Sequence, residues 1–234
     1  MYKPFYFSLF ILFILYSCSS KPSETTLKKI EEIRARLKKA VPLIPKAGDE
    51  KLITPVIGSI ADIVTYDTIH KKEVLGYEGI DYKYFISVAN GSKDAIELKK
   101  KQRFLFSSNS WRKLDPHPFA ENKFTVEQHA FYVNKLHSLK YICVSRVKSF
   151  TPGKGDKTSI TKPAHYQVWF WLIDVQNNNI VGSQLLEASS GGYVVIIGNN
   201  VAEALANDAR RSIVNKRNDT IRAWAGKLKK KGNK

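Results

Sequence analysis

Apolar residues recur at spacings of three and four along several stretches of the chain, a period typical of amphipathic helices. Leu27, Ile30 and Ile33 begin the first such stretch, and Pro42 ends it. A Thr-x-x-Gln capping box at Thr125 opens the third stretch. The predicted helices cover residues 25–40, 54–64, 125–138 and 200–225.

Strand patterns dominate the second half of the chain. The predicted strands cover residues 140–150, 165–175, 179–187 and 193–197. The second of them is apolar on both faces, which favours a central strand covered on both sides, with helix 200–225 on one side. Its aromatic run Tyr166–Trp171 could instead stack sugars or bases, but core packing is the favoured interpretation. The short turn Gln176–Asn179 predicts an antiparallel hairpin.

The first half carries weaker strand signals. Asn90-Gly91, between Tyr82–Ala89 and Lys93–Leu98, is typical of a type I′ hairpin turn. We expect a further strand at 102–107 and a loop with one strand at 66–81. Two prolines make Asp115–Pro118 a rigid connector and a predicted subdomain boundary. Together the elements predict an α+β fold, mostly antiparallel sheet flanked by helices.

A short apolar run, Phe5–Cys18, follows the positive charge of Lys3. It has the length of a secretory h-region and is shorter than the roughly 20 residues of a membrane-spanning helix. Its end, Leu15-Tyr16-Ser17-Cys18, resembles the lipobox of bacterial lipoproteins, although Tyr16 departs from the usual small residue. The alternatives are an ordinary signal peptide with an incidental cysteine, or an uncleaved anchor.

The lipobox resemblance implies that Cys18 is lipidated and holds the protein at the cell envelope, with Ser19 favouring the outer membrane. Several acyl chains anchor firmly because each buried CH₂ contributes about 0.8 kcal/mol. The predicted organisation is a lipoprotein signal peptide, a lipidated tether, an N-terminal region of helices and a hairpin, an α+β region and a basic tail. These parts cover residues 1–17, 18–24, 25–118, 119–226 and 227–234.

The net charge of +17, from 38 basic and 21 acidic side chains, predicts anionic partners. Nucleic acid would come first in a cytosolic protein, but an export signal argues against it. The expected partners are therefore the membrane itself and an anionic envelope polymer or acidic protein. The lysine tail is either a solvated end or a docking site. Its candidate contacts are Lys227, Lys229, Lys230 and Lys231.

Sequence motifs give little support for catalysis or cofactors. Cys143 lies in an apolar run and is expected to be a buried, inert thiol. His129 and His137 are two helical turns apart, and we expect no metal site and no cofactor. Thr151–Thr158 superficially suggests a phosphate loop, but Asp156 stands where a glycine belongs. Asp174 is the one carboxylate to consider as an acid, and its favoured role is to open the following turn.

The order of elements in Thr125–Ala225, with its Asp-Val-x-Asn-Asn turn, is loosely similar to envelope lipoproteins of the curli-secretion and penicillin-binding-protein-activator type. Two functional classes remain open. The first is a non-catalytic binding or scaffold module for an anionic envelope partner. The second is a hydrolase acting on wall or glycan material through a carboxylate. The sequence favours the first, and no enzyme activity is expected.

Overall fold

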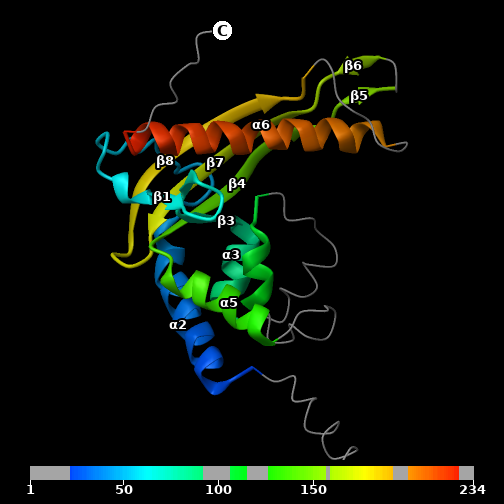
Figure 1. The fold of residues 1–234 in the computed structure, drawn as a ribbon. Coiled ribbons are helices and arrows are strands. Elements are labelled where there is room, and N and C mark those ends of the chain that lie inside the picture. The colour runs from blue at the N-terminus through cyan, green and yellow to red at the C-terminus, as the bar shows by residue number, and fades with distance from the viewer. Residues whose placement is uncertain (1–21, 92–105, 115–125, 157–158, 192–199, 227–234) are drawn as a thin grey trace, which may run out of the picture.

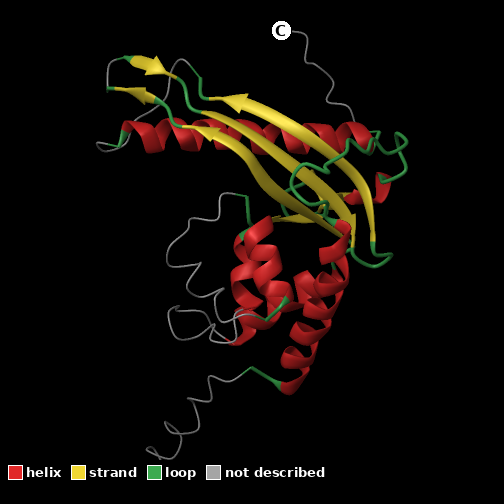
Figure 2. Cartoon of the chain, turned by 180° about the vertical axis from the view of Figure 1, so that it is seen from behind, coloured by secondary structure: helices red, strands yellow, loops and turns green. Residues whose placement is uncertain are grey.

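A four-stranded sheet lies between one long helix and a layer of shorter helices in the computed structural model (Figures 1 and 2). The structure describes residues 22–91, 106–114, 126–156, 159–191 and 200–226. The sheet strands are β3 (Tyr77–Asp81), β4 (Tyr141–Thr151), β7 (His165–Asp174) and β8 (Asn179–Ser189). The helices are α2 (Glu24–Ala40), α3 (Tyr82–Ala89), α5 (Val126–Ser138) and α6 (Val201–Trp224). Short 3₁₀ helices are η1 (Val41–Leu43), η2 (Ala61–Ile63) and η3 (Asn109–Leu114).

The strands follow the order β3-β4-β7-β8, in which β3 is parallel to β4 and the other pairs are antiparallel. Two small antiparallel ribbons accompany the sheet. They are β1 (Val64–Asp67) with β2 (Lys72–Leu75), and β5 (Lys154–Gly155) with β6 (Ile160–Lys162). The α+β prediction is confirmed. Because β3 precedes residues 115–118 and β4 follows them, segments from both sides of the predicted boundary share one sheet.

Strand β7 separates two apolar cores, as its two-sided apolar pattern predicts. Trp171 and Ile173 pack towards α2, α3 and α5, while Phe170 and Leu172 pack towards α6. All four side chains are fully buried. The turn after β7 joins it to β8 as an antiparallel hairpin, which confirms that prediction also.

The predicted first, third and fourth helices form α2, α5 and α6. The Ser23 hydroxyl caps α2 by accepting from the Thr26 amide, at 3.2 Å. The Asn200 side chain caps α6 by accepting from the Glu203 amide, at 3.0 Å. Both helices bury one apolar stripe against the sheet or its neighbours. Within the described residues, no helix is long and apolar enough to cross a membrane.

The predicted hairpin at Asn90-Gly91 is wrong in its first arm, because Tyr82–Ala89 forms helix α3. Phe85, Val88 and Ala89 face the core at helical spacing. Gly91 has φ 61° and its amide donates to the Val88 carbonyl, so the turn-forming glycine ends a helix. The second arm, Lys93–Leu98, lies outside the described residues.

The predicted helix at 54–64 is also wrong. Gly58 adopts φ 85° within it, and the segment forms turns, η2 and the start of β1. Just before it, Ile53 exchanges backbone hydrogen bonds with Ser183, which holds the chain extended along the edge of β8. The loop expected at 66–81 contains β2, β3 and the second half of β1 instead of one strand. The expected connector 115–118, the strand 193–197 and most of the strand 102–107 lie outside the described residues.

A basic cavity as the candidate functional site

Two sets of sequence-predicted residues, the lipidation site and the basic tail, are not placed by the structure. Cys18 and the tail lysines Lys227, Lys229, Lys230 and Lys231 lie outside the described residues. Their roles therefore stay predictions, and the candidate site must be built from the folded body.

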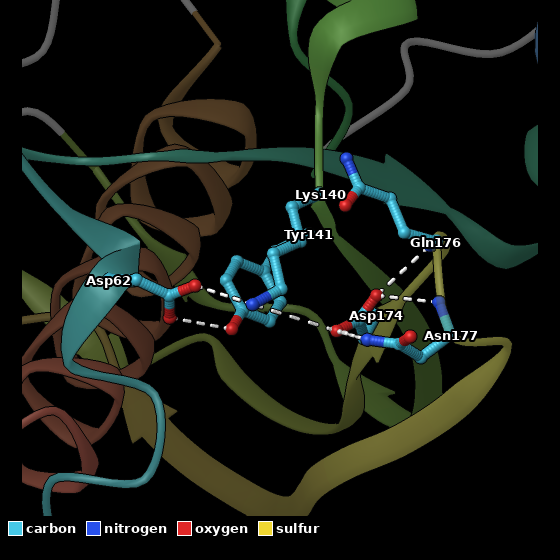
Figure 3. A network of polar contacts seen from close by, with 6 residues as sticks. All are labelled: Asp62, Lys140, Tyr141, Asp174, Gln176 and Asn177. Atoms are coloured by element: carbon cyan, nitrogen blue, oxygen red, sulfur yellow. Dashed lines mark hydrogen bonds and ion pairs between the residues drawn. The ribbon is translucent and has the colours of Figure 1, made fainter.

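Asp174 forms the turn that its position at the end of β7 predicts. Its Oδ1 accepts from the backbone amides of Gln176 and Asn177, at 3.0 and 2.9 Å, and its Oδ2 accepts from the Asn177 side chain, at 2.8 Å. Figure 3 shows these contacts closing the β7–β8 hairpin. The carboxylate is 4% exposed, and hydrogen-bond donors engage both of its oxygens. This arrangement holds the turn that follows β7.

A second carboxylate, Asp62, joins the same neighbourhood (Figure 3). Lys140 lies 2.5 Å from Asp62 and 3.9 Å from Asp174, and the Tyr141 hydroxyl donates to Asp62 at 2.7 Å. Burial alone would raise the pKa of Asp62, but the hydrogen bonds from Lys140 and Tyr141 outweigh it and hold that pKa below its usual range. The same hydrogen bond from Lys140 to Asp62 raises the pKa of Lys140. These contacts hold η2, which contains Asp62, against the start of β4.

The histidines and the lysine-rich loop also have local roles. His137 lies 2.6 Å from Glu32 on the neighbouring α2, whereas His129 is buried in the core. A search of the described residues finds no cluster of metal-ligating side chains. In the loop that resembles a phosphate loop, the Asp156 carboxylate accepts from the Ser159 amide at 2.8 Å and so stabilises its own turn.

A cavity of about 410 Å³ lies where β2 and β3 meet α6. It is lined by residues of three chain segments that are far apart in sequence. The lining residues are Lys72, Glu73, Val74, Leu75, Tyr77, Glu78, Gly79, Ser108, Val214, Arg217, Asn218 and Arg222. None of the site residues expected from the sequence is among them, so the sequence analysis did not predict this cavity.

Arg217 is the buried cation of the cavity wall. It projects from α6 with only 6% of its surface exposed. Its Nε donates to the Tyr77 hydroxyl at 3.1 Å, and its Nη1 donates to the Ser145 hydroxyl at 3.2 Å. Among the described residues, no carboxylate forms an ion pair with it. Its direct hydrogen-bond partners are therefore neutral, and the partly buried carboxylate of Asp81 interacts with its charge without forming an ion pair.

Tyr77 links the guanidinium to its neighbour on α6. Its hydroxyl accepts from Arg217 and donates to the Asn218 side-chain oxygen. The ring centroid lies 5.5 Å from the guanidinium carbon, a cation–π distance. Burial raises the pKa of Tyr77 to about 12. The phenol is thus neutral at physiological pH and can act as donor and acceptor at once.

Gly79 gives the guanidinium its space against the backbone of β3. A methyl group at this position would lie 2.6 Å from the Phe106 carbonyl oxygen and 3.2 Å from an Arg217 nitrogen. The Gly79 carbonyl also accepts from the Ser108 amide at 2.8 Å and from the Trp111 indole at 2.9 Å. The glycine therefore allows the close packing of β3, the Phe106–Ser108 segment and Arg217.

Two further cations line the cavity nearer to solvent. Lys72 is exposed on β2, and Arg222 is partly exposed on α6. Neither forms an ion pair with a carboxylate of the described residues. The Ser108 hydroxyl is buried and has no hydrogen-bond partner within the same part of the chain.

Two carboxylates share the lining with these cations. Glu78 is buried and paired with Lys135 of α5, at 2.5 Å, which balances its charge. Glu73 lies on the exposed β2 and has an interaction of its own. The cations without ion-pair partners thus leave the cavity positive overall, and it can accept an anionic group.

One sequence signal could have pointed to this site. Arg217 interrupts the apolar stripe of α6, one turn after Ile213 and one turn before Ile221, both of which are buried. An arginine at a core position needs polar partners, so its position predicts a polar site beneath the helix. Which strands supply the partners is not visible in the sequence.

The comparisons with known proteins are sparse. No protein-family model and no curated protein matches the chain. Among solved structures, the PelC dodecamer from Paraburkholderia phytofirmans is similar over 36% of this chain and 54% of the PelC chain, with 16% identity and a TM-score of 0.24. The chain thus matches about half the length of that protein, and this likeness carries no argument about function.

Proposed function

We propose that this protein is a lipid-anchored, non-catalytic binding protein of the cell envelope that takes an anionic group of its partner into the cavity beside Arg217. The anchor is Cys18, and the outer membrane is the expected location. The observation that carries the proposal is a buried guanidinium that has no carboxylate ion-pair partner among the described residues.

Removing a guanidinium from water is unfavourable unless hydrogen bonds and a counter-charge compensate for it. Tyr77 and Ser145 supply neutral acceptors, and the carboxylate of Asp81 attracts the charge of Arg217 without forming an ion pair with it. The charge of Arg217 is therefore solvated but only partly compensated. An anion that enters the cavity would complete this environment and gain a charge-assisted hydrogen bond, which contributes about 1.5–3 kcal/mol.

The rest of the molecule supports a role in binding anions. The net charge of +17 attracts anionic surfaces over the Debye length of about 8–10 Å at physiological salt. The described contacts of Asp174 and Asp62 are those of structural ties. No contact in the described residues favours the hydrolase alternative.

The proposal is tested by isothermal titration calorimetry of the full-length protein with simple carboxylate and phosphate compounds. We expect binding that weakens as salt rises from 0.1 to 1 M, and a loss of about 10-fold or more in affinity for Arg217→Met. Arg211→Met is the matched control, because Arg211 is exposed on the same helix and does not line the cavity.

A stability control accompanies this experiment, since Arg217→Met also removes buried hydrogen bonds. Arg222→Gln and Lys72→Gln change only the more exposed cations and should preserve the circular dichroism spectrum and the melting temperature. If anions bind the wild type with the same affinity at 1 M salt, or if none of the three cavity variants weakens binding, the proposed site is wrong.

A further inference from the structure

We infer that the ligand of this cavity is a phosphate ester whose organic part has about the size of one sugar or polyol unit. The inference rests on the proposed function, because it names the chemical class of ligand for the same site. It is argued from the charge, the hydrogen-bond donors and the size of the cavity.

The charge of the site exceeds what a single carboxylate requires. Lys72, Arg217 and Arg222 all line the cavity, and none pairs with a carboxylate of the described residues. A carboxylate brings one negative charge, whereas a phosphate monoester carries about 1.5 to 2 at neutral pH. Glu78 is balanced by Lys135, so Glu73 is the carboxylate to set against these three cations. About two positive charges remain, and they match the phosphate better than a carboxylate.

The available donors point the same way. A phosphate monoester presents three strong acceptor oxygens outside its ester link. Arg217 retains N–H groups beyond those that its Nε and Nη1 donate to Tyr77 and Ser145, and these can reach phosphate oxygens. The Ser108 hydroxyl has no partner within the described structure. Arg222 and Lys72 approach from α6 and β2. Donors thus converge from three chain segments, as recognition of a tetrahedral group requires.

The size and the apolar wall indicate that the phosphate carries an organic part. The volume of about 410 Å³ falls within the roughly 300–1,000 Å³ of small-molecule sites, more than a bare ion needs. Val74, Leu75 and Val214 line the same space. Their side chains can pack against the carbon skeleton of a sugar or polyol while the cations hold the phosphate.

The test compares two ligands that share a sugar but differ in their acidic group. Glucose 1-phosphate and glucuronate are titrated into the full-length protein by calorimetry, with inorganic phosphate as a third ligand. We expect glucose 1-phosphate to bind at least about 10-fold more tightly than glucuronate, because of its larger charge. Inorganic phosphate should bind more weakly than the ester, because it lacks the carbon skeleton.

The pH dependence gives an independent readout. The second pKa of a phosphate monoester is about 6, so its affinity should rise between pH 5 and 7.5, whereas that of glucuronate should not. The ionisable side chains that line the cavity from β2, β3 and α6 are Lys72, Glu73, Tyr77, Glu78, Arg217 and Arg222. None of these described side chains is a histidine, but burial raises the pKa of the neighbouring Asp81, whose charge acts on Arg217. Ionisation of Asp81 would affect both ligands, so a rise in affinity for glucose 1-phosphate alone is assigned to the phosphate.

Variants place the binding in the cavity. Arg222→Gln should reduce affinity for glucose 1-phosphate by about 3-fold or more, and Arg211→Met should leave it unchanged.

Dihexanoyl phosphatidic acid, used below its micelle concentration, tests the source of the phosphate. Binding tighter than that of glucose 1-phosphate identifies a lipid headgroup, and weaker binding identifies a soluble or polymeric ester. Both results support the phosphate-ester class.

Different results would contradict the phosphate-ester inference and the anion site itself. If glucuronate binds as tightly as glucose 1-phosphate, or if the affinity for the phosphate does not rise with pH, the phosphate-ester inference is wrong while the anion site stands. If neither compound binds, and the cavity variants behave like the wild type with every anion tested, the site itself is wrong and both proposals fall.

Discussion

The Tyr77 side chain couples the stability of the fold to alkaline pH. Its pKa is raised from 10 to about 12 by burial, so the folded state favours the neutral phenol. The resulting stabilisation is fully present below pH 10, the value of the unfolded chain, and is lost as pH rises through 12. Two pH units correspond to about 2–3 kcal/mol.

We therefore expect the free energy of unfolding to fall between pH 10 and 12, and to fall less steeply in Tyr77→Phe. Urea denaturation at several pH values measures both slopes. The variant lacks the hydrogen bonds to Arg217 and Asn218, so its stability is lower at every pH, and only the slope is diagnostic. Equal slopes in the two proteins would show that Tyr77 does not titrate differently on folding.

The Cys143 thiol should be unreactive in the folded protein. It is completely buried in β4, and burial raises its pKa to about 11. In the Cys18→Ala variant it is the single thiol, and we expect Ellman's reagent to label it at least about 1,000-fold more slowly than in 6 M guanidinium, because labelling requires unfolding. Rapid labelling of the native variant would contradict the buried position.

For single residues, the sequence predicts the environment of a side chain when its partners are close in sequence. Cys143 lies in an apolar run and Asp174 precedes a turn, and both have the predicted environment. Arg217 is different, because its partner Tyr77 is 140 residues away and Ser145 lies on a third element. The interrupted apolar stripe of α6 predicts that Arg217 needs a polar environment, but only the tertiary fold shows which residues provide it.

Helix α6 carries two of the three cations that line the cavity, so the stability of this helix matters for the site. Its N-cap can be tested by substitution. The Asn200 side chain accepts from the Glu203 amide. Asn200→Ala should lower the free energy of unfolding by about 1 kcal/mol, as loss of an N-cap does. Asn200→Asp keeps an acceptor and adds favourable charge at the helix start, so it should retain stability. Equal losses in both variants would rule out capping as the cause.

The elements that the sequence predicts well are those with long, regular patterns of apolar residues. Helices α2 and α6 and strands β4, β7 and β8 carry such patterns over 10 to 24 residues. Helix α3 has only eight residues, and its Asn90-Gly91 end fits a hairpin turn as well as a helix terminus. For such a short segment, packing against the core decides between the two structures, and that packing is not a local property.

The whole molecule depends on one pairing that no local pattern predicts. Strand β3 joins β4 in parallel, with Tyr77 opposite Tyr141, although a long stretch of chain separates them. This pairing brings β2, β3 and α6 together and so creates the cavity. The layers of the fold could be predicted from the second half alone. The cavity could not be predicted in this way, because its lining residues come from both sides of the predicted boundary at residues 115–118.

The proposed envelope location depends on the predicted lipidation of Cys18, which a single substitution tests. Cys18→Ala removes the acceptor thiol of the lipobox-like sequence, so we expect loss of labelling by a fatty-acid probe and release from the membrane fraction. Several acyl chains are needed for stable anchoring, and the basic surface alone should be displaced by salt. High-salt washing of the membranes therefore separates the two contributions.

Cys143→Ala is the matched control, because it removes the other cysteine of the chain from a buried site and should leave lipidation unchanged. Retention of Cys18→Ala in washed membranes, at the level of the wild type, would contradict the lipid anchor. It would not contradict the proposed anion site, since Arg217 and its partners lie in the folded body and not in the anchor segment. The predicted location and the proposed anion binding can therefore be tested independently, and either can be wrong without the other.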